Sequence, residues 1–197
     1  MDVYTSENEQ VEALRRWWEK NGRAAIIAFA VVIAAVLGFR AWQEHKNARA
    51  AEASAIYQQM LEQEDPAAVL ESGRSLLANY GDTAYASLAS LAMAAASVQQ
   101  NDLDAAAGHL RAAMDAAKIP GIRQAAAVRL ARVLLSQGKA KEALAVLDGT
   151  DPTGLRGAVE EARGDAQLAL GDTAAARQAY QNALAAYGDV PTKQNLL

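Results

Sequence analysis

The longest uninterrupted apolar stretch of the chain is Ala24–Phe39, AAIIAFAVVIAAVLGF, which would be apolar on every side of a helix. A helix of this length spans about 24 Å, slightly less than the ~30 Å hydrocarbon core of a bilayer. Arg23 and Arg40 at its ends can extend their charges toward the headgroups. Three tryptophans flank the stretch, where aromatic residues typically mark the membrane interface: Trp17, Trp18 and Trp42. The pattern predicts one transmembrane helix over residues 23–42, after a tail of residues 1–22 and before a domain of residues 43–197.

Two other interpretations of this stretch fit the sequence less well. A buried core helix usually carries a polar stripe, whereas Ala24–Phe39 would need protein on all sides. A cleaved signal peptide begins with a short basic region, whereas five acidic residues lie within residues 1–22. We therefore expect an uncleaved anchor.

The positive charges beside the anchor predict its orientation. Four precede it and three follow at a similar distance: Arg15, Arg16, Lys20 and Arg23 before, and Arg40, Lys46 and Arg49 after. Because positive residues favour the cytoplasmic side, we expect a cytoplasmic N-terminus and an exported C-terminal domain. Within the anchor, Ala30, Ala34 and Gly38 recur every four residues, which favours close contact with another membrane helix. Lipid-facing alanine explains the same spacing equally well.

Apolar positions with helical spacing continue beyond the anchor. Neither proline nor glycine interrupts the chain between Arg40 and Pro66, so we expect one helix from about Val11 to Gln63, with Gly22 and Gly38 as its weak points. In Tyr80–Thr83, Gly81 is expected to be the C-cap of one helix, and the N-cap of the next helix should follow it directly.

Helix-breaking turns then recur at nearly constant spacing. They lie at Asp65, Asn101, Gly138 and Gly171, separated by 36, 37 and 33 residues. A period near 34 residues is typical of tetratricopeptide repeats, in which each turn joins the two helices of a hairpin. An irregular alanine-rich bundle, the alternative, predicts no constant spacing.

The hairpins resemble the tetratricopeptide pattern to different degrees. The last hairpin matches it best, at Gly164, Gly171, Ala176, Tyr180, Ala183 and Leu184. The hairpin around Gly138 matches at Ala131, Ala143 and Leu147, and that around Asn101 at Ala94, Ala106, Leu110 and Ala113. The first hairpin, around Asp65, matches the pattern only at Leu70 and Leu77. The predicted fold class is all-α: one N-terminal transmembrane helix followed by a right-handed solenoid of about four tetratricopeptide-like hairpins.

Composition and charge agree with this fold class and exclude several kinds of partner. Aromatic residues make up 6% of the 197 residues and prolines number four, while alanine, the best helix former, is abundant. The net charge of −4 and the lack of a basic stripe argue against nucleic acid. The absence of cysteine removes disulfides and thiolate zinc sites.

The sequence offers no catalytic, cofactor or metal site. His45 and His109 lack nearby ligands at metal-binding spacing, and no phosphate-binding loop or nucleophile motif occurs. Glu160 and Glu161 are adjacent and so point about 100° apart on a helix, which favours a solvated surface over a carboxylate pair. We expect a non-enzymatic protein without a cofactor.

The predicted binding surface is the concave face, lined by the first helix of each hairpin. Registering the hairpins on their turns places Leu88, Leu91, Val98 and Gln99 there, then Val128, Arg132 and Leu135, then Ala158, Glu161, Asp165 and Leu168. We predict partner contacts at Leu91, Val98, Gln99, Val128, Arg132, Leu135, Glu161 and Asp165. Core packing is the alternative for the apolar members, and ion pairs between repeats for the charged ones.

Three segments carry a resemblance that covers essentially the whole chain: Trp17–Gly22, Gly38–Trp42 and Tyr80–Ala86. With the single anchor and the degenerate repeats, the chain resembles the YfgM-type ancillary subunits of the bacterial Sec translocon. The resemblance implies an inner-membrane protein with a periplasmic repeat domain. Its implied partners are SecYEG and a membrane-anchored periplasmic chaperone of the PpiD kind, with a role in handing over translocated proteins.

Two further possibilities stay open. The chain could instead be a scaffold for another cell-envelope complex, which pull-down partners would distinguish. Self-association through an exposed last helix, Thr173–Tyr187, would make it a homo-oligomer.

Overall fold

The computed structural model describes residues 3–151 and 153–188, and all of its regular elements in those ranges are α-helices. They are α1 (Val3–Leu61), α2 (Pro66–Tyr80), α3 (Tyr85–Gln99), α4 (Leu103–Ala116), α5 (Pro120–Ser136), α6 (Ala140–Asp148), α7 (Arg156–Ala169) and α8 (Thr173–Gly188). The chain divides into two compact units, Met1–Ala48 and Arg49–Leu197. Each unit is described by itself below.

The long helix expected around the anchor is confirmed, since α1 runs without interruption through the apolar stretch and ends at Leu61. This helix is long and apolar enough to cross a membrane. Its apolar window has no buried residue in the described structure, and Phe29 is 68% exposed. The segment is therefore not a core helix of this chain.

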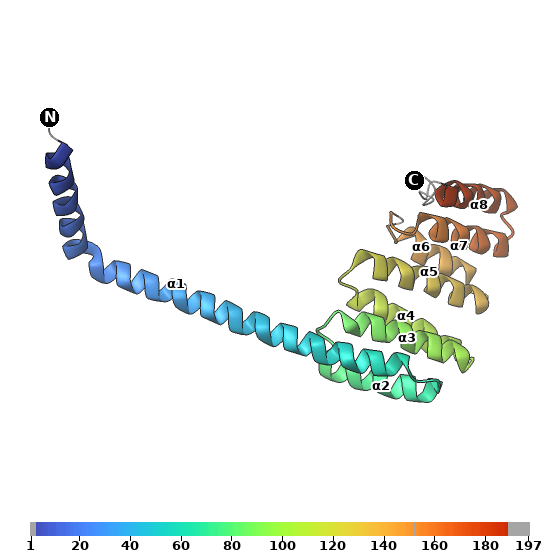
Figure 1. Ribbon diagram of the computed structural model, residues 1–197. Helices are drawn as coiled ribbons and strands as arrows, with labels where there is room; N and C mark the ends of the chain where they lie inside the picture. Colours follow the sequence, from blue (N-terminus) through green and yellow to red (C-terminus); the bar gives the residue numbers. More distant parts are fainter. Residues whose placement is uncertain (1–2, 152, 189–197) are drawn as a thin grey trace, which may run out of the picture. The chain divides into compact units, whose positions relative to one another are not determined.

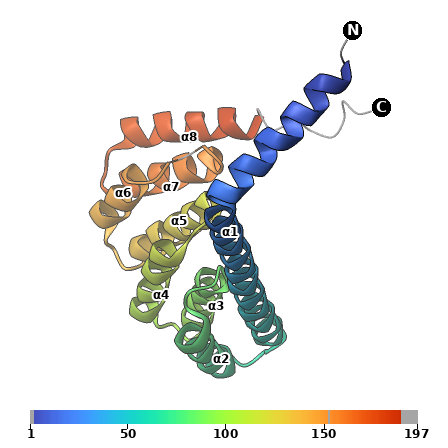
Figure 2. The ribbon, with the colours of Figure 1, turned by 90° about the vertical axis from the view of Figure 1, so that its left-hand side faces the viewer.

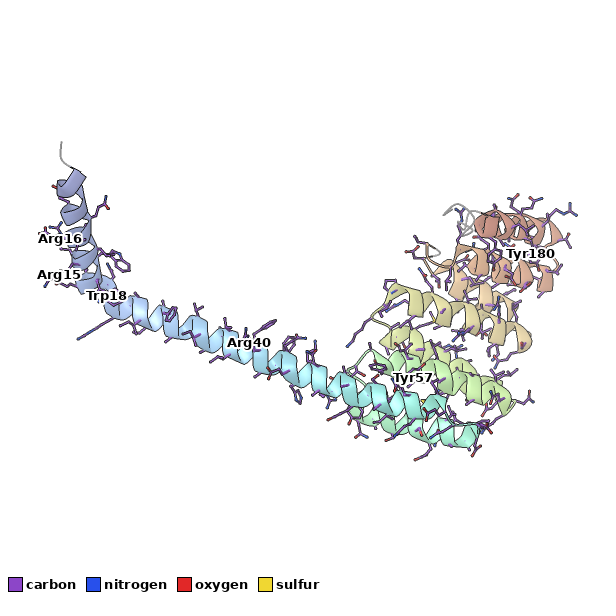
Figure 3. The ribbon with its side chains drawn as sticks, in the orientation of Figure 1. Arg15, Arg16, Trp18, Arg40, Tyr57 and Tyr180 are labelled. Atoms are coloured by element: carbon purple, nitrogen blue, oxygen red, sulfur yellow. The ribbon has the colours of Figure 1, made fainter. Side chains whose placement is uncertain are left out.

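In the first unit, α1 bends beside Trp18 (Figure 3). The indole of Trp18 covers Gly22, where an added Cβ would lie 3.3 Å from Trp18 Cε2. The side chain of Asn21 donates a hydrogen bond to the carbonyl oxygen of Trp17, at 3.2 Å. Gly22 was one of the two expected weak points of the helix. At Gly38, the other, a Cβ would meet nothing within 4 Å.

In the second unit, the helices stack in chain order from α2 to α8, and they fan out in the view of Figure 2 (Figures 1 and 2). The end of α1 pairs with α2, and the pairs α3–α4, α5–α6 and α7–α8 follow. The described part of the unit thus consists of helical hairpins, as the turn spacing predicted.

Three of the predicted turns share the same backbone conformation. Asn101, Gly138 and Gly171 adopt positive φ angles of 59°, 74° and 84°. The residue after each donates its N–H to a carbonyl five residues earlier: Asp102 to Ser97 at 2.9 Å, Lys139 to Leu134 at 2.8 Å, and Asp172 to Gln167 at 3.0 Å. This is the Schellman ending of a helix, which satisfies its last carbonyl groups and starts the next helix in a fixed direction.

The other connections use different caps. Asp65 is the N-cap of α2, where its carboxylate accepts the N–H of Ala67 at 3.0 Å. Gly81 is the C-cap of α2, as predicted, but its φ of −61° is right-handed. The expected capping side chain at the start of α3 is absent, because the N-cap is Ala84 and Thr83 instead donates to the carbonyl of Tyr80 at 2.8 Å.

Two clusters of buried apolar side chains hold the stacked helices together. The larger core cluster joins α3 to α7 around Leu110, Leu130, Leu134 and Leu147, all at most 2% exposed. The smaller cluster packs Met60 of α1 against Leu76 and Met93. Leu184 departs from the repeat pattern: it is 71% exposed, because α8 is the last described helix and no following hairpin covers it.

Candidate partner-binding surface

A surface pocket of about 490 Å³ lies between α3, α4 and α5. Four of the eight residues predicted to contact a partner line it: Leu91, Val98, Gln99 and Arg132. The remaining lining residues are Ala94, Ala95, Leu110, Arg129 and Val133. The pocket thus gathers four of the predicted residues from two consecutive hairpins, and their binding of a partner stays a prediction.

The pocket combines an apolar floor with a charged rim. Leu110 is 2% exposed and Val133 8%, so they form the floor, whereas Val98 at 45% forms an accessible edge. Arg129 and Arg132 are exposed along the α5 side. Such a surface can accept an apolar side chain and place a carboxylate or a peptide carbonyl next to a guanidinium.

Other predicted contact residues lie outside this pocket. Val128 is only 4% exposed and belongs to the core, so it does not line an accessible groove. Leu135 is half-buried and packs against the same core. Periodicity alone cannot separate a concave position from a core position when both lie on neighbouring faces of one helix. Of the additional concave residues, Leu88 and Ala158 are half-buried and Leu168 is 52% exposed.

The charged members of the predicted set make interhelical contacts. Arg132 of α5 lies 3.5 Å from Glu161 of α7, and their side chains are 50% and 43% exposed. This ion pair joins consecutive hairpins, and such exposed pairs contribute about 0–1 kcal/mol. Asp165 accepts a hydrogen bond from the Tyr180 hydroxyl at 2.8 Å, and Glu161 accepts one from Tyr187 at 2.7 Å. These hydrogen bonds raise the pKa of both tyrosines.

Glu160 is not on a solvated surface, contrary to expectation. It is 8% exposed and forms an ion pair with Arg163. Its other carboxylate oxygen accepts a hydrogen bond from the Asn182 amide at 3.3 Å. These partners compensate the burial of its charge. Glu161, by contrast, is partly exposed, so the two adjacent carboxylates do point to different surroundings.

A second polar cluster, which sequence reasoning missed, holds the end of α1 to the α2–α3 connection. Arg49 donates to the Asp82 carboxylate at 2.6 Å and to the carbonyl of Asn79 at 2.7 Å. The Tyr80 hydroxyl donates to Glu52 at 3.0 Å. The hydrogen bond from Arg49 lowers the pKa of Asp82.

This cluster gives one of the resemblance segments a structural role. Tyr80 and Asp82 belong to the Tyr80–Ala86 segment, and the ring of Tyr85 lies 5.9 Å from that of Tyr57 on α1 (Tyr57 is labelled in Figure 3). The segment therefore attaches the last turns of α1 to the first hairpins. The Tyr80–Ala86 segment stands out in the sequence. Its contact residues on α1 lie about 30 positions earlier in the chain, so local sequence patterns do not reveal the pairing.

Neither histidine contributes to a metal site in the described residues, where no group of three potential ligands gathers. His109 is half-buried on α4, and burial lowers its pKa. On the anchor, Ala30, Ala34 and Gly38 are all exposed, so the predicted contact with another membrane helix stays a prediction.

Comparison with known proteins places the anchor and the repeats in one family. The family described as "Tetratricopeptide repeat-like domain" matches residues 15–197. A protein of Aggregatibacter actinomycetemcomitans named "Ancillary SecYEG translocon subunit" is 34% identical over 92% of this chain and 90% of its own length. Proteins of the same name from Escherichia coli K12 and Neisseria gonorrhoeae are 32% and 28% identical, over 92% and 98% of this chain and 88% and 91% of their own lengths.

These similarities span the long apolar helix as well as the hairpins, which agrees with the all-α architecture described above. The chain belongs to the family of tetratricopeptide repeat-like proteins that includes the ancillary SecYEG translocon subunits.

Proposed function

We propose that this protein is a non-enzymatic, membrane-anchored subunit that associates with the SecYEG translocon. The observation that carries the proposal is the similarity to ancillary translocon subunits over about nine-tenths of both chains, so that anchor and repeat domain are matched together. Residues 1–22 form a cytoplasmic tail, residues 23–42 span the inner membrane, and residues 43–197 form a periplasmic domain. The excess of one positive charge before the anchor supports this orientation.

The repeat domain is the protein-binding part of this proposal. Its pocket between α3 and α5 presents Leu91 and Val98 beside Arg129 and Arg132. Stacked helical hairpins offer such surfaces to partner chains without a change in fold. A membrane-anchored periplasmic chaperone or an emerging exported protein would contact this pocket, and Glu161 and Asp165 would extend the surface along α7.

Two further contacts belong to the proposal. In the membrane, Ala30, Ala34 and Gly38 would let another helix approach closely. In the periplasm, Leu184 and Tyr187 of α8 are 71% and 49% exposed, and a second copy of the chain could cover them.

The decisive experiment is affinity purification of the tagged full-length protein from membranes in mild detergent, followed by mass spectrometry. SecYEG subunits and a membrane-anchored chaperone are the expected companions. A second tagged chain carries Val98→Glu, which alters the pocket but not the anchor, so a partner that binds the pocket should be lost and one that binds the anchor should be kept. If other envelope proteins co-purify and SecYEG does not, the translocon assignment is wrong.

A further inference from the structure

One face of α1 upstream of the apolar stretch is apolar and exposed. Val11 and Leu14 are each 66% exposed, and Trp17 and Trp18 are 50% and 53% exposed. At about 100° per residue these four side chains fall on one side of the helix. Together with Arg15 they line a single shallow hollow on its surface. In the described part of this unit, no other segment buries this face.

The opposite face of the same segment is charged. Glu12, Arg16 and Lys20 lie there and are exposed. Arg15 is engaged with Glu19 at 3.2 Å along the helix edge. A segment with tryptophan and leucine on one face and charged residues on the other is typical of helices that lie in the interfacial layer of a membrane. It differs from Ala24–Phe39, which is apolar on all sides.

The bend in α1 separates these two kinds of helix. It lies at the end of the amphipathic segment, beside the labelled Trp18 (Figure 3). The Trp18 indole packs over Gly22, just before Arg23 and the apolar stretch begin. A bend at this point allows the amphipathic segment to follow a different direction from the apolar segment within the same unit.

We propose that the segment from Val11 to Lys20 lies in the plane of the bilayer, with Val11, Leu14, Trp17 and Trp18 in the lipid interface. A lipid surface is the occupant that the structure favours, because this face is continuous with the helix that enters the membrane. Arg16, Lys20 and Arg23 also match anionic headgroups in charge. The inference rests on membrane insertion of Ala24–Phe39, part of the proposed function, but not on any protein partner.

The chain lacks cysteine, so single labels can be introduced without background. Full-length variants carrying Val11→Cys, Leu14→Cys or Trp18→Cys place a spin label on the apolar face. Glu12→Cys and Arg16→Cys are the matched controls on the charged face, and Ile33→Cys reports insertion of the apolar stretch. Each labelled protein is placed alone in nanodiscs of phosphatidylethanolamine and phosphatidylglycerol, and its collisions with oxygen and with a water-soluble nickel complex are compared.

The expected result is preferential collision with oxygen, at one shallow depth, for the labels at positions 11, 14 and 18. The labels at positions 12 and 16 should favour the nickel complex, and the label at position 33 should be deepest. Introducing Trp17→Gln and Trp18→Gln should shift the label at position 14 toward water, whereas Glu12→Gln, on the charged face, should leave it in lipid.

Three outcomes would overturn the inference. A depth that increases steadily from position 11 to 18 means that the segment enters the membrane directly. Strong nickel collisions on the apolar face place it in water, and weak collisions with both reagents mean that protein covers it. A water-exposed label at position 33 would instead show that Ala24–Phe39 does not insert into the membrane, which contradicts the proposed function as well.

Discussion

The ring of Tyr180 lies over the α-carbon of Gly164, so closely that a Cβ on Gly164 would be 2.6 Å from Tyr180 Cε1. The ring of Tyr187 covers Gly157 in the same way, at 2.5 Å from Cε1. The two glycines are seven residues apart on α7, and the two tyrosines are seven apart on α8. The last hairpin is therefore held at two levels by an aromatic ring packed against bare backbone.

The variant Gly164→Ala should destabilise the protein by about 1–3 kcal/mol, the usual cost of overpacking a filled contact. The ring of Tyr180 would have to move, and its hydrogen bond to Asp165 would move with it. Urea unfolding of the full-length protein in detergent, followed by far-ultraviolet circular dichroism, measures the change. Tryptophan fluorescence would not report it, because the tryptophans lie in residues 17–42.

Gly108→Ala is the matched control for that variant. Gly108 lies inside α4, and a Cβ there would meet nothing within 4 Å. Replacing an open helical glycine by alanine should stabilise the protein by about 0.5–1 kcal/mol. Changes of opposite sign in the unfolding free energy of the two variants would show that the contact with the Tyr180 ring limits the site. Equal changes would show that only helix propensity affects stability at these glycines.

Asp82→Asn should weaken the attachment of α1 at neutral pH and reduce the acid sensitivity of unfolding. The hydrogen bond from Arg49 lowers the folded-state pKa of Asp82. Its contribution is therefore present above the unfolded pKa of about 3.9 and is lost as the pH falls through the lower folded value. The urea midpoints of wild type and variant should differ at neutral pH and converge in acid. Asp115→Asn, which removes an exposed carboxylate from α4, is the matched control for the loss of one negative charge.

The left-handed turns predict a pair of opposite effects. Gly138→Ala should destabilise by about 1 kcal/mol, because a side chain is strained at positive φ. Asn101→Gly should stabilise slightly, since glycine relieves the same strain at φ 59°. Gly121→Ala, where a Cβ would meet nothing within 4 Å, controls for the added methyl group. Denaturant midpoints measure all three, and a loss of stability in Asn101→Gly would contradict the role of the turn.

Val98→Glu should weaken binding of the partner that occupies the α3–α5 pocket by about tenfold or more, because it would place an unpaired charge on the apolar edge that the partner covers. Val98 is 45% exposed, so the change should not unfold the domain. The measurement is the amount of partner that co-purifies with each variant. Ile119→Glu, at a 53% exposed position just before α5 and outside the pocket, adds the same charge and should have little effect. If both variants lose the same amount of co-purified partner, the binding surface is not this pocket.

The sequence alone determined the fold class, because its signals are local. An apolar run of helix length marks the anchor, and helix-ending residues at nearly constant spacing mark the hairpins. The turns at Asn101, Gly138 and Gly171 depend on backbone conformations that a few neighbouring residues decide. Register on those turns also predicted that Leu91, Val98 and Arg132 share one face, and the structure shows all three lining one pocket.

Only the tertiary structure decided which face of each helix is covered and by what. Val128 and Arg132 are one helical turn apart, yet the first is buried and the second lines the pocket. Glu160 is buried and accepts a hydrogen bond from Asn182 of α8, and Arg49 donates to Asp82, a residue more than 30 positions away. Helical periodicity repeats every few residues, whereas burial and charge pairing depend on neighbours that only the stacking of hairpins brings together.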